Sequence, residues 1–166
     1  LQTIQQWLET ITTNKVAQIM IVGWAFAFFI EGTSGFGTPV ALAAPILVGL
    51  GFNPVRVIML CLVMNTIPVS FGAVGMPTWF GLGNLELATA TLEAIGNKTA
   101  LIHSVIGLVI PIFALRFLIK WKTIRQNIGF IYLSILSCVI PYALLSFISI
   151  EFPALIGGAI GLGVTV

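Results

Sequence analysis

The stretch EGTSGFGTP, residues 31–39, interrupts an apolar region and decides how this chain folds. It holds three Gly, two Thr, one Ser, one Glu and one Pro, a mixture that does not suit an uninterrupted helix. Apolar runs flank it, over residues 16–30 and 40–52. The first run would be about 22 Å long as a helix, whereas the hydrocarbon core of a bilayer is about 30 Å thick. We therefore predict a re-entrant hairpin over residues 16–52, whose tip is buried in protein.

The composition of the whole chain indicates a membrane protein. Of 166 residues, 58% are hydrophobic and 7% are charged, and the mean hydropathy is +1.12. A typical soluble domain has about 25% charged residues, and a disordered chain is poor in apolar ones, so both classes are excluded. The net charge of +2 is too small to suggest a nucleic-acid partner. We predict an all-α, polytopic transmembrane helical protein in contact with the lipid bilayer.

Further segments follow from the order of apolar and polar runs. The stretch NTIPVSFGAVGMPT, residues 65–78, places two Pro and two Gly in an apolar region, so we expect a broken helix over residues 55–83. Residues 101–119 and 128–150 are each long enough to span the bilayer. The remaining predictions are an interfacial amphipathic helix over residues 1–14 and a truncated segment over residues 154–166.

Loop charges predict the orientation in the membrane. The loop KWKTIR, residues 120–125, is basic, and the positive-inside rule places it in the cytoplasm. Stepping back through the spans puts Arg56 and Lys15 on the same side and residues 85–99 outside. The hairpin is then expected to open from the cytoplasmic side.

The two interruptions are candidates for a substrate site. Thr38 followed by Pro39 is a helix-start signal, with Thr38 expected as the N-cap. A helix that begins near mid-membrane points free N–H groups and its positive dipole end at an anion. The alternative is that small residues merely allow close helix packing. The candidate substrate-binding residues are Gly32, Thr33, Ser34, Gly35, Gly37, Thr38, Asn65, Thr66, Ser70 and Thr78.

Two ionisable residues are candidates for proton coupling. Glu31 lies at the hairpin tip, and a carboxyl group at membrane depth can hold a proton near neutral pH. A protonated Glu31 would accept an anion beside it, whereas an ionised one would repel it. The alternative is that Glu31 caps local backbone N–H groups. His103 could relay protons, although its place near the end of a span favours the alternative of a packing histidine with satisfied hydrogen bonds.

Enzymatic chemistry finds no support in the sequence. The chain has no Asp, one His, no GxSxG motif and no cluster with metal-ligand spacing. Cys61 and Cys138 lie in apolar segments and are interpreted as buried free thiols. We therefore expect no enzyme, no metal and no cofactor. A channel or a non-transporting membrane subunit is the alternative class, although no stretch resembles a selectivity filter.

Two stretches carry a specific family resemblance. FIEGTSGFGTPVALAAPILVGLGF, residues 29–52, and CLVMNTIPVSFGAVGMPTWFG, residues 61–81, are similar to the L-lactate permease family of bacterial secondary transporters. The resemblance extends to KTALIHSVIG at residues 98–107 and SCVIPYALLSF at residues 137–147. The EG-x-x-GFG-TPVA tip is specific, whereas the individual apolar runs are not.

The resemblance implies proton-coupled transport of L-lactate and related 2-hydroxy monocarboxylates, such as glycolate, across the bacterial inner membrane. It also implies membership of a larger superfamily of transporters built from inverted repeats. The alternative function is therefore that of a sodium-coupled carboxylate transporter, or of another anion transporter, from the same superfamily. Family members are several times longer than this chain. We therefore expect 1–166 to be a fragment of one transmembrane transporter domain, completed by the remainder of its own chain and assembled as a possible homo-oligomer.

Overall fold

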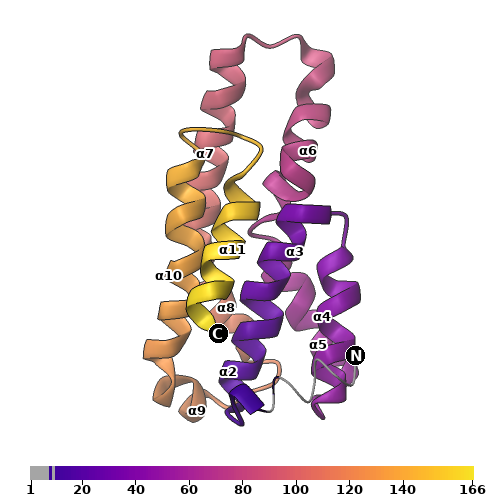
Figure 1. Ribbon diagram of the computed structural model, residues 1–166, viewed down its shortest axis with the longest axis vertical. Helices are drawn as coiled ribbons and strands as arrows, with labels where there is room; N and C mark the ends of the chain where they lie inside the picture. Colours follow the sequence, from indigo (N-terminus) through magenta and orange to yellow (C-terminus); the bar gives the residue numbers. More distant parts are fainter. Residues whose placement is uncertain (1–7, 9) are drawn as a thin grey trace.

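The structure is a computed structural model that describes residue 8 and residues 10–166. The described part of the chain is helical and contains no strand, as the sequence predicts (Figure 1). Its elements are α2 (Lys15–Ile19), η1 (Met20–Phe26), α3 (Ala27–Ser34), α4 (Thr38–Gly49), α5 (Pro54–Asn65), η2 (Val69–Phe71), α6 (Gly72–Leu82), η3 (Gly83–Leu85), α7 (Thr89–Gly107), α8 (Ile110–Leu115), α9 (Trp121–Gln126), α10 (Ile128–Leu145) and α11 (Pro153–Thr165).

Two helices in the described residues are long and apolar enough to cross a membrane. They are Lys15–Ser34, which joins α2, η1 and α3, and Ile128–Leu145, which is α10. A third crossing results if Pro54–Asn65 and Val69–Leu85 count as one bent span. The interfacial helix predicted over residues 1–14 falls mostly outside the described residues.

The first arm of the predicted hairpin is longer than expected. The helix continues past Ile30 to Ser34, so it has 20 residues and includes Glu31. Thr33 and Ser34 each donate a hydroxyl hydrogen bond of 2.9 Å to the Ile30 carbonyl oxygen. Such bonds to the preceding turn let Ser and Thr remain helical. The chain therefore turns only at residues 35–37, and the re-entrant arrangement over residues 16–52 stays a prediction.

The turn between α3 and α4 depends on left-handed backbone. Gly35, Phe36 and Gly37 have φ values of 59°, 52° and 80°. Gly37 is the N-cap of α4, and no side chain caps this helix. The expectation that Thr38 is the N-cap is therefore wrong: Thr38 is the first residue of α4, because Gly37 reaches the left-handed region more readily than any residue with a Cβ.

The broken helix predicted over residues 55–83 has a counterpart in the structure. The helices Pro54–Asn65 and Val69–Leu85 are bent by 65° relative to each other. Within α6, Ala73, Val74 and Gly75 have φ values of 43°, 56° and 75°, so this part is left-handed rather than α-helical. α5, η2 and α6 thus form one interrupted segment.

The span predicted over residues 101–119 is not one helix. α7 begins earlier, at Thr89, and ends at Gly107, and the short α8 starts at Ile110. Pro111 explains the interruption, since it has no N–H to donate and its ring would collide with the carbonyl group four residues back. Val109 instead bonds the Ile106 carbonyl oxygen at 3.0 Å, a tighter turn.

The core forms where α11 packs against α3 and α10. Glycines make this packing close: a Cβ on Gly158 would lie 2.5 Å from the backbone of Phe29, and one on Gly157 would lie 2.9 Å from the Cys138 carbonyl oxygen. The helix Lys15–Ser34, which contains α3, is central: 72% of its most apolar 18-residue stretch is buried, whereas the value for α10 is 33%.

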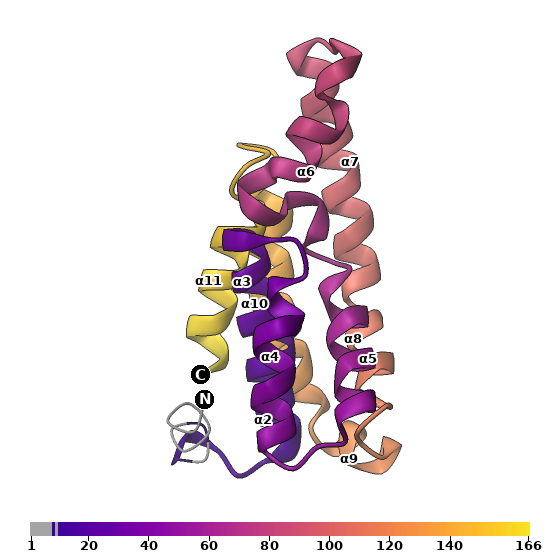
Figure 2. The same ribbon diagram turned by 90° about the vertical axis from the view of Figure 1, so that its right-hand side faces the viewer.

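The basic elements gather at one end of the molecule. Figures 1 and 2 show α9 and the beginnings of α2 and α5 at the end of the long axis opposite to the protruding α6–α7 pair. Lys15, Arg56 and Arg125 lie in these elements. Asn14 also donates a 2.7 Å hydrogen bond to Asn127, which joins α2 and α10 at this end.

Candidate functional site

A buried carboxyl group marks the place where the two interrupted segments meet. Glu31, in the last turns of α3, is 0% exposed. Its Oε2 accepts a 3.1 Å hydrogen bond from the Asn65 side-chain amide at the end of α5. Its Oε1 is buried and has no hydrogen-bond partner among the described residues. Fully buried carboxyl groups normally have several partners, so this one is unusual.

Glycines bring the tip and the break together. A Cβ on Gly72 would lie 2.5 Å from Glu31 Oε1, and one on Gly35 would lie 3.0 Å from the Ala73 Cβ. A Cβ on Gly32 would overlap the backbone of Leu155 in α11. At these positions glycine allows protein elements to approach one another closely, which is the packing alternative, and a role in binding a ligand stays a prediction.

Most predicted hydroxyl ligands bond their own backbone. Thr33 and Ser34 donate to Ile30, and Thr66 donates to the Val63 carbonyl oxygen at 2.7 Å. Thr78 donates to the carbonyl oxygen of Ser70 at 2.6 Å, which ties α6 back to η2. Thr33, Ser34 and Thr66 are exposed, so their hydroxyl oxygens can still accept a hydrogen bond from a ligand.

His103 belongs to a different hydrogen-bond chain. Its Nδ1 lies 3.3 Å from the hydroxyl oxygen of Tyr142, and that hydroxyl donates to the Ile67 carbonyl oxygen at 3.3 Å. His103 thus contacts the break from α7, whereas Glu31 contacts it from α3. The structure records no hydrogen bond between the two proposed coupling residues in the described part of the chain.

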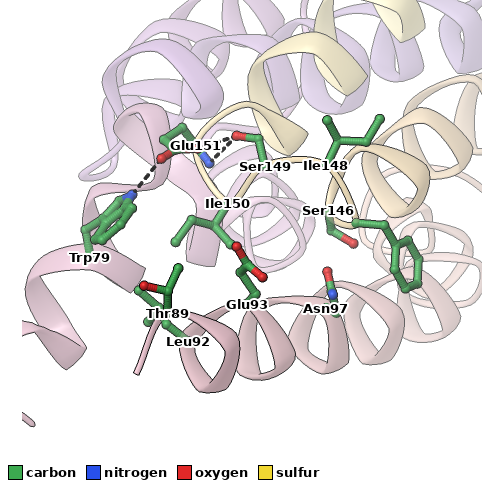
Figure 3. Close-up of a pocket in the computed structure, with 11 residues that line it drawn as sticks. Trp79, Thr89, Leu92, Glu93, Asn97, Ser146, Ile148, Ser149, Ile150 and Glu151 are labelled. Carbon is green, nitrogen blue, oxygen red and sulfur yellow. Dashed lines mark hydrogen bonds between the residues drawn. The ribbon is translucent and has the colours of Figure 1, made fainter. Parts of the chain in front are cut away.

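A polar cleft lies near the protruding end, at a place that the sequence does not single out. It has a volume of about 240 Å³ between α6, α7 and the loop before α11 (Figure 3). Trp79 donates an indole hydrogen bond of 3.1 Å to Glu151, and Glu93 and Asn97 line the opposite wall. Only the tertiary structure brings these residues together, since they come from three separate segments.

Hydrogen bonding stabilises the ionised form of Glu151. The Ser149 hydroxyl donates to the carboxylate, and this bond holds the pKa of Glu151 below its ordinary value. Partial burial acts in the opposite direction, and the Trp79 indole assists the Ser149 hydroxyl. The group is therefore an anion at the mouth of the cleft at neutral pH.

Comparison with known proteins identifies the family. A family described as L-lactate permease matches residues 1–166, which is the whole chain. The chain belongs to the L-lactate permease family. A putative L-lactate permease of Haemophilus influenzae is 60% identical over 163 residues, which are 98% of this chain and 31% of that protein. The L-lactate permease of Streptococcus iniae is 34% identical over 170 aligned residues, covering 98% of this chain and 34% of the relative.

This member of the L-lactate permease family spans about a third of the length of those two relatives. The L-lactate permease of Escherichia coli K12 is 50% identical over 74 residues, 45% of this chain and 13% of its own. No solved structure matches the chain. The two stretches that resemble the L-lactate permease family, residues 29–52 and 61–81, are the ones that meet around Glu31.

Proposed function

We propose that the full-length protein is a secondary transporter that carries L-lactate and related 2-hydroxy monocarboxylates, such as glycolate, across the bacterial inner membrane together with protons. Membership of the L-lactate permease family supports the substrate class. The observation that carries the mechanism is the fully buried Glu31 at the contact between the hairpin and the broken helix. An ionisable group at membrane depth is costly and is by default a functional hypothesis.

In the proposed cycle, the charge on Glu31 controls access of the anion. A 2-hydroxy monocarboxylate is negatively charged at neutral pH, so an ionised Glu31 repels it and a protonated Glu31 does not. α4 begins only seven residues later, and the positive end of its dipole favours an anion. Proton and anion then bind together, and no net charge crosses the membrane.

The groups proposed to hold the substrate lie around the turn before α4. A Cβ on Gly37 would have nothing within 4 Å, so space for a ligand remains there. Thr33, Ser34 and Thr38 place hydroxyl groups next to this turn, and Thr66, Ser70 and Thr78 are proposed to line the broken-helix side. The multi-pass orientation is proposed to place the end with α9 in the cytoplasm, because Lys and Arg accumulate there.

Uptake of labelled L-lactate by membrane vesicles that contain the full-length parent protein tests this function. We expect accumulation with an inward proton gradient and competition by glycolate. Accumulation with an inward sodium gradient alone would favour the sodium-coupled rival and remove the proton from the mechanism. Absence of uptake under both gradients would contradict the substrate assignment.

Replacement of the buried carboxyl group separates coupling from binding. In the Glu31→Gln variant we expect lactate exchange across equilibrated vesicles to continue, because the amide is neutral like the protonated acid. Proton-driven accumulation should fall to the level seen without a gradient. The exposed Glu93→Gln is the matched control and should accumulate lactate like the wild type. Wild-type accumulation by Glu31→Gln would exclude Glu31 from coupling.

A further inference from the structure

Glu31 is covered directly by the backbone of the broken helix. A Cβ on Gly72 would lie 2.5 Å from Glu31 Oε1 and 3.1 Å from its Cδ, so any larger residue here would displace the end of the Glu31 side chain. Oε1 is buried and unpartnered in the described structure. The contact therefore excludes water from the carboxyl group without replacing the hydrogen bonds that water would supply.

Asn65 is suited to both protonation states of this carboxyl group. Its Nδ2 donates to Glu31 Oε2 at 3.1 Å, while its own Oδ1 is buried and has no partner among the described residues. A side-chain amide offers donors on one side and an acceptor on the other. It can donate to a carboxylate and, after rotation, accept from a carboxylic acid. This chemistry assigns Asn65 to Glu31 rather than to the substrate.

The backbone that follows Gly72 is strained. Ala73 and Val74 have φ values of 43° and 56°, and a β-branched residue is a genuine outlier in this region. The segment is packed at both ends: a Cβ on Gly35 would lie 3.0 Å from the Ala73 Cβ, and one on Gly75 would lie 2.5 Å from the Ile150 carbonyl oxygen. Strained backbone persists only where its surroundings hold it, so loss of these contacts would let the segment relax.

We propose that Asn65 and Gly72 are positioning residues that complete the site of Glu31. Asn65 orients the carboxyl group, and residues 66–75 form a lid that closes on it through Gly72. Glu31 exchanges its proton only when this lid lifts. The statement that this proton is the transported one rests on the proposed function, whereas the covering of Glu31 by the lid does not.

Carbodiimide labelling measures access to Glu31 in the full-length parent protein in its membrane. Dicyclohexylcarbodiimide adds to a protonated carboxyl group and leaves a stable N-acylurea, which mass spectrometry locates on the peptide. At a pH acidic enough to protonate the carboxyl group in both samples, we expect labelling of Glu31 to be at least tenfold slower in the native membrane than after unfolding in SDS. The Glu31→Gln variant should lose the labelled peptide, which confirms the site.

The lid is tested by a matched pair of glycine variants. Gly72→Ala places a methyl group against Glu31 and should speed its labelling at least fivefold. Gly81→Ala is the control, since a Cβ there has nothing within 4 Å, and should label at the wild-type rate. Asn65→Ala adds no bulk and should also speed labelling of Glu31. If Gly72→Ala labels as fast as SDS-unfolded protein, that variant has not folded, and Asn65→Ala then tests the lid.

Two results would overturn the lid. One is labelling of native wild-type Glu31 as fast as in SDS, and the other is wild-type labelling rates in both Gly72→Ala and Asn65→Ala. Neither measurement requires lactate or a gradient. A protected Glu31 in a protein without proton-driven uptake would therefore reject the proposed function and keep the lid.

Discussion

Tyr142 donates a hydrogen bond to the backbone of the broken helix, at the break between its two parts. Its hydroxyl donates to the carbonyl oxygen of Ile67, which lies between α5 and η2. A backbone carbonyl group at membrane depth has no water to bond, so such a partner must come from protein. The Tyr142 ring also packs edge to face on Phe28 and Phe71, each at 5.5 Å between centroids.

At the scale of single residues, the chain offers a matched test of this hydroxyl. Tyr142 is 0% exposed and Tyr132 is 38% exposed. We expect Tyr142→Phe to lower the free energy of unfolding by about 1 kcal/mol, since it removes the hydroxyl that bonds the Ile67 carbonyl oxygen and contacts His103 Nδ1. Tyr132→Phe should change it little. Unfolding in SDS titrations of the parent protein measures both, and equal stabilities would contradict the role of Tyr142.

At the scale of elements, α11 depends on glycines along the face that meets α3 and α10. A Cβ on Gly161 would overlap the sulfur of Cys138, whereas one on Gly163 would have nothing within 4 Å. The same helix therefore carries a packed glycine and an open one two residues apart. The structure therefore places a close helix contact at Gly161 and open space at Gly163.

We expect Gly161→Ala to destabilise the protein by about 1–3 kcal/mol, because the added methyl group overpacks the contact with Cys138. Gly163→Ala should instead be neutral or stabilise by up to about 1 kcal/mol, because alanine favours a helix. Thermal unfolding of the purified parent protein in detergent measures the difference. A similar loss of stability in both variants would contradict the prediction, because it would show that packing on α10 does not determine the effect of the substitution.

The loop between α10 and α11 makes a pH-dependent contact with α6. The pKa of Glu151 is lowered by the Ser149 hydroxyl, so this contact is present at neutral pH and is lost as pH falls through that lowered pKa. In Ser149→Ala the pKa should rise toward its ordinary value, and the contact should be lost at a higher pH. A ¹³C NMR titration of the Glu151 carboxyl measures this. Ser146→Ala is the control, because the Ser146 hydroxyl donates to the Ala143 carbonyl oxygen rather than to Glu151.

At the scale of the whole molecule, apolar side chains remain exposed on several helices. Phe113, Leu144 and Ile148 are 64%, 63% and 81% exposed. Such surface requires lipid or further protein to cover it. The chain also spans about a third of the length of relatives such as the Haemophilus protein. Both observations agree with a helical part of a larger membrane protein.

We expect residues 1–166, expressed alone in membranes, to give no lactate accumulation above empty vesicles, whereas the full-length parent accumulates it. The physical reason is that the proposed site contains one hairpin and one broken helix, and an inverted-repeat transporter binds its substrate between two such halves. Parallel uptake assays at matched protein levels provide the measurement. Full accumulation by the 166 residues alone would reject the need for a second repeat.

Much of the fold could be predicted from the sequence because its signals are local. Low charge and long apolar runs indicated a helical membrane protein, and the Gly and Pro residues within 31–39 and 65–78 indicated the two interruptions. The single helix predicted over residues 101–119 was wrong, since the effect of Pro111 on the preceding turn outweighed the apolar pattern. The capping role of Thr38 was wrong for an equally local reason, the left-handed Gly37.

The sequence by itself determined the class of protein and the family, and it singled out Glu31 as a candidate, since composition and a contiguous motif contain that information. Only the tertiary structure decided what Glu31 contacts. The meeting of Glu31 with Asn65 and Gly72, and the Trp79–Glu151 cleft, join segments that are far apart along the chain. Such contacts follow from how helices pack in three dimensions, which residue spacing along one helix does not specify.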